Sequence, residues 1–201
     1  MRSDRMSTVA SSPAPIEPHS YFYPGGSRLA LSAHPTPTTL YARPLLPEDL
    51  ALYIEFVENL SMEDLQTRLH GAGFKRARTI DPEVLRRMLD VNPKEEVVLG
   101  VMARSGTCET LLAVARARWL PRMEEADFAL TVRSDHKREG LGRRALQALI
   151  DYCRALGIKT LVGETTCANT PMLHLARSFG FSTSACSDNE VMLRRSLQEI
   201  G

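Results

Sequence analysis

Two glycines lie among basic residues in the stretch Lys137-Arg138-Glu139-Gly140-Leu141-Gly142-Arg143. Glycine has no Cβ, so an anion can come close to the main chain at Gly140 and Gly142. The side chains of Lys137, Arg138 and Arg143 add positive charge around the same point. Backbone N–H groups at the start of a helix also attract anions. If a helix begins here, this stretch predicts a site for a phosphate or pyrophosphate group.

The flanking residues predict a strand before this stretch and a helix after it. Polar and apolar residues alternate over 126–132, as is typical of a half-buried strand. From Leu141 to Leu156, apolar residues recur at spacings of three and four, which indicates an amphipathic helix. Gly157 follows where a C-terminal cap belongs. The order strand, glycine-bearing loop, helix would therefore expose backbone N–H groups at a helix N-terminus.

The sequence of the loop does not match either of two common phosphate-binding motifs. The chain contains neither G-x-x-x-x-G-K-[ST] nor G-x-G-x-x-G. It has the motif [Q/R/K]-x-x-G-x-G, followed by the predicted helix and by a second strand predicted at 159–165. After that strand come the stretches Asn169-Thr170-Pro171-Met172 and Ser178-Phe179-Gly180-Phe181. This combination resembles the GNAT superfamily of N-acetyltransferases over roughly residues 40–195. Its strongest part is most similar to the acetyltransferase domain of bacterial protein lysine acetyltransferases.

The resemblance implies an α/β fold with a mixed, mostly antiparallel central sheet flanked by helices. It also implies acetyl-CoA as cosubstrate and no metal. The residues expected at the coenzyme are Leu130, Thr131, Val132, Lys137, Arg138, Glu139, Gly140, Leu141, Gly142, Arg143 and Asn169. In the family, backbone groups of the strand at 130–132 meet the pantetheine arm and the acetyl oxygen. Asn169 also suits a helix N-cap, and both roles stay open.

Acetylation of an amine by direct attack requires a base. A free lysine has a pKa of about 10.4 and is mostly protonated at neutral pH. Asp127 lies on the predicted strand a few residues before the loop, and we expect it to accept this proton. The enzymes that the chain resembles usually have Glu here, so the shorter Asp favours a relay through water. A solvated strand acid is the alternative; Glu164 is the fallback base, and Glu124 and Glu125 are less favoured.

The resemblance fails at the residue that would protonate the leaving thiolate. Many GNAT enzymes have a Tyr seven residues after the Asn, and here that position is Ala176. Ser178 and His174 are weak substitutes, although a thiolate can leave without an acid. We therefore expect an N-acetyltransferase of an amine, with a protein lysine favoured over a small-molecule amine. The alternative is a catalytically quiet acyl-CoA-binding module that regulates a partner.

Before the loop, the sequence predicts a strand at 38–43 and helices that begin at Pro47, Ser61 and Asp81. Strands follow at 96–104, 110–120 and 125–133. Beyond the loop we expect a helix at 171–178 and strands at 181–187 and 190–195. The family places the early helices on the acceptor side of the site.

The composition of the chain limits the kinds of partner that we expect. The chain of 201 residues has 25 Lys and Arg against 24 Asp and Glu, so nothing indicates nucleic-acid binding. No apolar run reaches the roughly 18 residues that span a bilayer. Four cysteines without a C-x-x-C pair make a metal site or disulfide framework unexpected, and we expect a cytoplasmic protein.

Residues 1–38 hold half of the 12 prolines and predict an irregular arm, with the folded domain at 39–201. The oligomeric state is not indicated.

Overall fold

The structure is a computed structural model that describes residues 38–68, 81–120, 124–187 and 189–198. The predicted N-terminal arm lies almost wholly outside these residues. The strands are β1 (Thr39–Pro44), β2 (Glu96–Ser105), β3 (Cys108–Trp119), β4 (Glu125–Val132), β5 (Thr160–Thr166), β6 (Ser182–Ala185) and β7 (Glu190–Ser196). The helices are α1 (Leu50–Glu58), α2 (Met62–Arg68), α3 (Pro82–Leu89), α4 (Leu141–Ala155) and α5 (Thr170–Ser178), with 3₁₀ turns η1 (Pro47–Asp49) and η2 (Ser134–His136).

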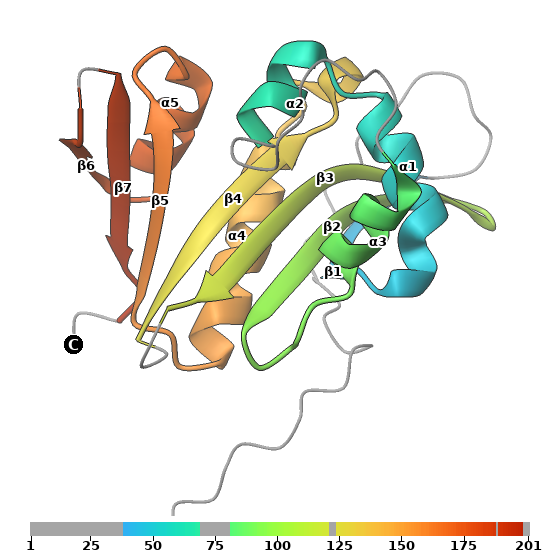
Figure 1. The fold of residues 1–201 in the computed structure, drawn as a ribbon, viewed down its shortest axis with the longest axis horizontal. Coiled ribbons are helices and arrows are strands. Elements are labelled where there is room, and N and C mark those ends of the chain that lie inside the picture. Colours follow the sequence, from blue (N-terminus) through green and yellow to red (C-terminus); the bar gives the residue numbers. More distant parts are fainter. Residues whose placement is uncertain (1–37, 69–80, 121–123, 188, 199–201) are drawn as a thin grey trace, which may run out of the picture.

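The strands form one sheet of seven in the order β1-β2-β3-β4-β5-β7-β6 (Figure 1). Every neighbouring pair is antiparallel except β4 and β5, which run parallel and are connected through α4. This arrangement confirms the predicted mixed, mostly antiparallel sheet.

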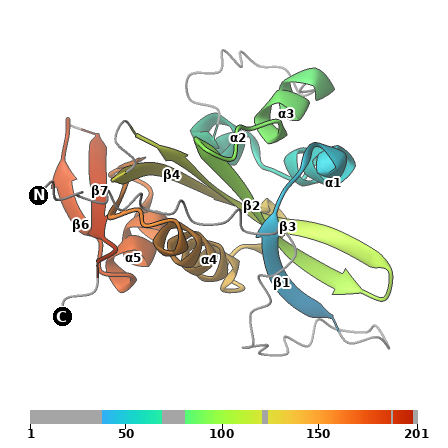
Figure 2. The ribbon, with the colours of Figure 1, turned by 90° about the horizontal axis from the view of Figure 1, so that it is seen from below.

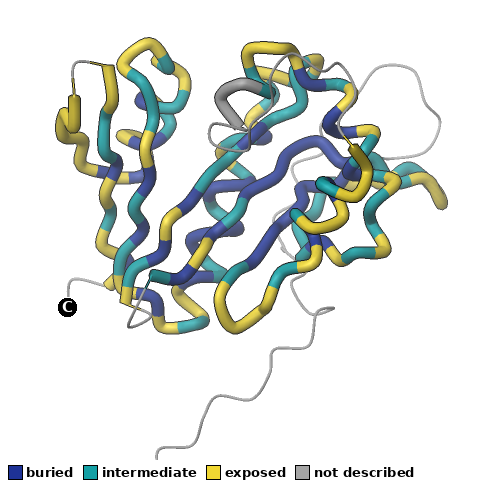
Figure 3. Tube along the Cα trace, viewed as in Figure 1, coloured by how far each residue is buried: buried dark blue, intermediate teal, exposed yellow. Residues whose placement is uncertain are grey.

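Helices cover the sheet on both faces. Figure 2 shows α4 and α5 on one face and α1, α2 and α3 on the other. Successive residues of β2 therefore point into different cores: Val97 packs with α4, whereas Val98 packs with α1 and α3. The centre of the sheet is buried from both sides, as the dark tube of β2 and β3 shows in Figure 3. This buried centre positions β4 and the loop that follows it.

The helix boundaries arise from the residues that the sequence indicated. Pro47 opens η1, and the Asp81 side chain accepts a hydrogen bond from the Glu83 N–H at 2.9 Å to cap α3. Gly157 has φ of 77° and follows the last turn of α4. Residues with side chains cannot take this backbone conformation without strain, so glycine ends the helix here.

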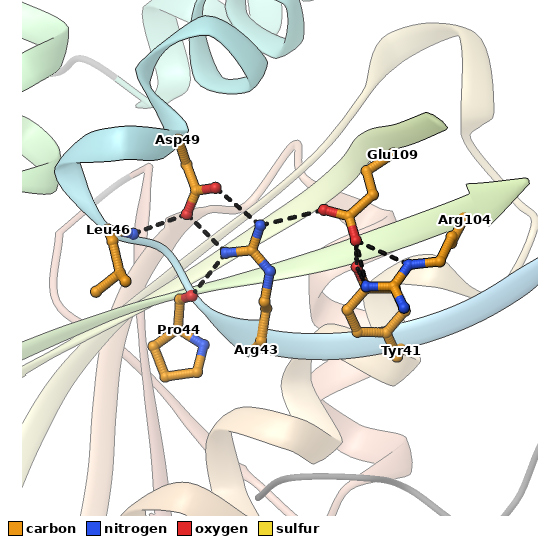
Figure 4. Close-up of polar contacts among 7 residues, drawn as sticks. All are labelled: Tyr41, Arg43, Pro44, Leu46, Asp49, Arg104 and Glu109. Carbon is orange, nitrogen blue, oxygen red and sulfur yellow. Dashed lines mark hydrogen bonds and ion pairs between the residues drawn. The ribbon is translucent and has the colours of Figure 1, made fainter. Parts of the chain in front are cut away.

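A polar network attaches β1 to the start of α1 (Figure 4). The Arg43 guanidinium donates to both carboxylate oxygens of Asp49, at 2.6 and 2.8 Å, and also to Glu109 at 3.4 Å. Tyr41 and Arg104 donate to Glu109 in turn. Partial burial opposes ionisation of Asp49, but its hydrogen bonds from Arg43 and from the Leu46 N–H hold its pKa below the ordinary value. The fold therefore stabilises the Asp49 carboxylate.

Replacing Asp49 by Asn is expected to lower the free energy of unfolding at neutral pH by about 1–2 kcal/mol, because Arg43 loses its main ionic partner. A depressed carboxyl pKa gives stability that is present above the unfolded-state pKa of about 3.9 and lost as pH falls through the folded value. The gap between wild type and variant should close toward pH 3. Urea unfolding at a series of pH values measures it, and a gap independent of pH would contradict the assignment.

Candidate active site

The parallel strands β4 and β5 pair only over a short length. Their register runs from Glu125 opposite Thr160 to Asp127 opposite Val162. On its other side β4 stays paired with β3 as far as Val132. Figure 1 shows β4 and β5 separating beyond the paired part. The edge of β4 that faces β5 therefore has no strand partner after Asp127.

The main-chain groups at this free edge follow from the hydrogen bonds to β3. The Arg133 N–H donates to the Leu112 carbonyl at 2.9 Å, and the Glu125 carbonyl accepts from the Leu120 N–H at 2.9 Å. Odd-numbered residues of β4 thus face β3, and because strand residues alternate, Leu130 and Val132 direct their N–H groups toward the gap. Thr131 directs its N–H toward β3. Of the three predicted main-chain contacts, 130 and 132 have the orientation that a ligand in the gap would need.

The loop after β4 has a special backbone. Arg138 has φ of 67° and Gly140 has φ of 78°, both in the left-handed region. Gly140 is the N-cap of α4, and no side chain caps that helix. A Cβ at Gly140 would meet nothing within 4 Å, whereas a Cβ at Gly142 would point at side chains of β4 and α5, 3.4–3.6 Å away. The open approach to the main chain is therefore at Gly140, and Gly142 lies on the packed side.

Several loop side chains already have partners within the protein. The Lys137 ammonium lies 2.6 Å from an Asp64 carboxylate oxygen, and the His136 ring lies 3.1 Å from the Glu139 carboxylate. The Arg143 guanidinium lies 4.9 Å from the centre of the Phe179 ring.

The remaining loop positions differ in what they expose. Arg138 is exposed, whereas the Leu141 side chain is buried in the core. A ligand at this loop could therefore meet Leu141 only through its main chain. Arg138 is one of the predicted cations that are exposed to solvent.

Asn169 caps α5. Its Oδ1 accepts from the Met172 N–H at 3.2 Å, and its Nδ2 donates to the Thr165 hydroxyl at 3.0 Å. The predicted N-cap role is confirmed. One amide hydrogen and one carbonyl lone pair have no partner in these two bonds, so the predicted contact with a coenzyme stays a prediction.

Asp127 and Glu164 lie on the same sheet face, away from α4. Asp127 is opposite Val162, and Glu164 follows two residues later on β5, so both carboxylates project from this face beside the gap. Both side chains are exposed, and neither forms an ion pair with the described residues. The pKa of Asp127 is nevertheless raised, because nearby protein displaces part of its water and because the Glu164 charge repels its ionised form.

The other candidate acids are engaged elsewhere. Glu125 is ion-paired with Arg194, and Glu124 lies 3.0 Å from the Lys159 ammonium. Their charges are therefore partly neutralised, which favours Asp127 and Glu164 as the acids available at the gap.

The position of the usual tyrosine supplies no hydroxyl. Ala176 is fully buried on α5. Ser178 and His174 are exposed, and the Ser178 hydroxyl donates to the Leu175 carbonyl at 2.7 Å. The Ser178 hydroxyl hydrogen is therefore already engaged, and a role of either residue as the acid stays a prediction.

Among the described residues, no three His, Cys, Asp or Glu side chains gather as metal ligands. In the same part of the chain, no helix has the length and apolar character to cross a membrane.

The model of the acetyltransferase (GNAT) family matches residues 60–181, which is more than half of the chain. The chain belongs to the GNAT acetyltransferase family. It is accordingly an acetyl-CoA-dependent acetyltransferase.

Solved structures confirm the GNAT fold. The GNAT domain of S. lividans PAT has a TM-score of 0.67 and 21% identity, over 79% of this chain and 90% of that one. For yncA from Salmonella typhimurium, solved with its cofactor acetyl-CoA, the TM-score is 0.60 and the identity 20%, over 80% and 95% of the two chains. The ribosomal-protein-S18-alanine N-acetyltransferase from Escherichia coli has a TM-score of 0.57 and 17% identity, over 81% and 96%.

The residues present fit acetyl-CoA. The gap between β4 and β5 exposes an unpaired main-chain edge that suits the amides of a pantetheine arm. The uncapped start of α4, with its open approach at Gly140, suits a pyrophosphate. We expect these two features to belong to one coenzyme site, although Lys137 is already paired with Asp64.

Sequence reasoning missed Asp64 and Ser134. The sequence Ser61-Met62-Glu63-Asp64 predicts only the start of a helix. In the structure, Asp64 on α2 accepts hydrogen bonds from Ser134 and Lys137, some 70 residues later in the chain. No local sequence signal reports a contact over that separation.

Proposed function

We propose that this GNAT enzyme acetylates an amine of a protein, with a lysine side chain as the favoured acceptor and Asp127 as the general base. The observation that carries the proposal is the place of Asp127, which is the last residue of β4 paired with β5 and lies on an exposed sheet face. A carboxylate here adjoins the point where the strands separate and where the main chain of Leu130 and Val132 faces the gap.

Each group has a chemical task in this proposal. Asp127 accepts the proton of the acceptor ammonium, directly or through one water, and the freed nitrogen lone pair attacks the acetyl carbonyl carbon. The raised pKa of Asp127 suits this task, because a carboxylate with a higher pKa is a stronger base. One N–H group of this edge, that of Leu130 or that of Val132, donates to the carbonyl oxygen as negative charge develops on it, and the other is free for a pantetheine amide, because N–H groups two residues apart on a strand lie about 6.6 Å apart. Acetyl-CoA supplies the activated acetyl group: its C–S bond breaks as the new C–N bond forms, the acetyl group stays on the nitrogen, and coenzyme A leaves as a thiolate.

The sheet face beside Asp127 supports a protein acceptor. Across it, Val162 is opposite Arg194, and Arg194 is opposite Ser182 on the edge strand β6. Glu164, Arg194 and Ser182 are exposed, and Figure 3 shows exposed residues along β6 and β7. A polar, exposed strand surface suits a peptide segment more than it suits a small amine. The resemblance to bacterial protein lysine acetyltransferases supports the same acceptor.

A panel of acceptors tests this proposal. We expect release of free coenzyme A thiol with lysine-containing peptides, and mass spectrometry should place the acetyl group on the lysine side chain. The matched control is the same peptide with its lysine already acetylated. Polyamines, amino acids and aminoglycosides should react more slowly. Turnover with these small amines but not with peptides would overturn the protein acceptor.

Buried Ala176 favours one alternative, in which the domain binds acyl-CoA and regulates a partner. Without a tyrosine hydroxyl at this position, the leaving thiolate has no acid there. Acetyl-CoA binding without thiol release, for every acceptor in the panel, would favour this alternative.

A further inference from the structure

The N-terminus of α2 departs from the capping box that its sequence predicts. The Ser61 hydroxyl accepts from the Asp64 N–H at 3.1 Å, which is the first half of such a box. In the second half, the acid at the third helical position would accept from the N–H of the cap residue. Here the Ser61 N–H donates to the Ser134 hydroxyl instead, at 2.7 Å. The Asp64 carboxylate is therefore directed elsewhere.

That carboxylate reaches the loop between β4 and α4. It accepts from the Lys137 ammonium at 2.7 Å, from the Ser134 hydroxyl at 2.5 Å and from the Ser61 hydroxyl at 2.8 Å. Partial burial opposes its ionisation, but these three donors hold the pKa of Asp64 below the ordinary value. Asp64 thus contacts Ser134, the first residue of η2, and Lys137, the residue directly after η2.

A second set of contacts joins α1 to the same loop. The Arg133 guanidinium donates to Glu55 at 3.0 Å, and the Ser134 N–H donates to the Asn59 carbonyl at 3.3 Å. Helices α1 and α2 and the start of the loop between β4 and α4 are therefore connected by hydrogen bonds in the folded chain.

The backbone just after Lys137 needs such support. Arg138 has φ of 67°, and a residue with a side chain in the left-handed region costs on the order of 1–3 kcal/mol. A conformation of this kind persists when surrounding contacts fix the chain on either side. Lys137, held by Asp64, is the residue directly before it, and Gly140 at the N-cap of α4 follows two residues later.

We propose that Asp64 is a positioning residue for coenzyme binding, which acts by holding Ser134 and Lys137 so that the main chain of 138–140 keeps its anion-binding conformation. In this proposal, the main role of Lys137 is the ion pair that holds α2 against the loop. The phosphate groups are bound by the main chain and by the remaining cations. This role links the acceptor-side helix α2 to the affinity for acetyl-CoA. The inference rests on the coenzyme and not on which amine is acetylated.

Asp64→Asn tests the proposal, since Asn keeps the size of the side chain and removes its charge. We expect the dissociation constant for acetyl-CoA to rise roughly 3- to 10-fold, in line with loss of one charge-assisted contact. Turnover at saturating acetyl-CoA should stay near wild type, because Asp64 does not touch the reacting atoms. Titration calorimetry and steady-state kinetics give the two quantities separately.

Glu83→Gln is the matched control. Glu83 is also an acid in the first turn of a short helix, and its carboxylate lies 3.5 Å from Arg86, an exposed partner on the same helix. This variant removes the same charge without a link to the loop, so acetyl-CoA affinity should be unchanged.

Three further variants test whether Asp64 positions the loop or only competes with the phosphates for Lys137. If Asp64 acts through Lys137, Lys137→Met should weaken acetyl-CoA binding to a similar extent, and the double variant should be little worse than either single one. Ser134→Ala should weaken binding in the same direction and keeps the proposal testable if Asp64→Asn does not fold. Unchanged affinity in Asp64→Asn would overturn the proposal. Tighter binding would overturn it as well, because Asp64 would then only withhold Lys137 from the phosphates.

Discussion

Asp127→Asn is expected to lower turnover by about 10²–10⁴-fold while acetyl-CoA affinity stays near its wild-type value, as for loss of a general base. Asn preserves the size of the side chain on β4, and Asp127 is exposed, so the change should not disturb the fold. The two readouts are turnover with the best acceptor of the panel and calorimetric binding of acetyl-CoA. Wild-type turnover in the Asn variant would make Asp127 an ordinary surface acid.

The pH profile adds a sharper test of the same role. Raising the pH increases the neutral fraction of the acceptor amine, so high pH should partly restore the Asn variant. Asp127→Glu should retain activity, since the resembling enzymes usually have Glu at this position. Glu164→Gln is the matched comparison on β5, because it removes the neighbouring carboxylate from the same face. A loss in Glu164→Gln that exceeds the loss in Asp127→Asn would move the base to Glu164.

The raised pKa of Asp127 also predicts an effect on stability. A carboxyl group whose pKa is higher in the folded state than in the unfolded state disfavours folding once it is ionised. At neutral pH the Asn variant should therefore unfold at a slightly higher temperature than wild type. Lower activity with equal or higher stability would separate a lost base from a damaged fold, and differential scanning fluorimetry measures the second quantity.

Local patterns in the sequence were sufficient for the elements that depend on nearby residues. The loop at 137–143 and the following amphipathic helix were predicted from glycine spacing and from apolar periodicity, and α4 begins at Leu141 as expected. The left-handed conformation at Gly157 follows from a glycine at a helix end. Such features are set within one or two helical turns, so a single sequence contains them.

Features that join segments far apart in the chain could not be predicted from local sequence patterns. The separation of β4 from β5 is a property of the main chain, and the side chains of Leu130 and Val132 do not encode it. The pairing of Lys137 with Asp64 spans 73 residues and gives a partner within the protein to a cation that the sequence assigned to the phosphates. Gly142 resembled Gly140 in the sequence, yet its Cβ position points at packed side chains.

Gly140→Val is expected to weaken acetyl-CoA binding by about 10–100-fold, which corresponds to loss of charge-assisted hydrogen bonds worth about 1.5–3 kcal/mol. A side chain here would project into the open space beside the start of α4, from which a phosphate would approach. It would also be strained, because φ at Gly140 is 78°. Strain alone could weaken binding, so the variant needs a control with equal strain.

Gly157→Val provides that control at the opposite end of the same helix. Gly157 has φ of 77°, and a Cβ there also meets nothing within 4 Å, so both variants should lose about 1–2 kcal/mol of stability through the same backbone strain. Only Gly140 lies at the helix N-terminus, where the N–H groups attract an anion. Saturating acetyl-CoA should therefore raise the unfolding temperature of Gly157→Val nearly as much as that of wild type, and that of Gly140→Val much less. Equal stabilisation of the two variants would mean that the coenzyme phosphates do not bind at this loop, because the only difference between the variants is the end of α4 at which the side chain is added.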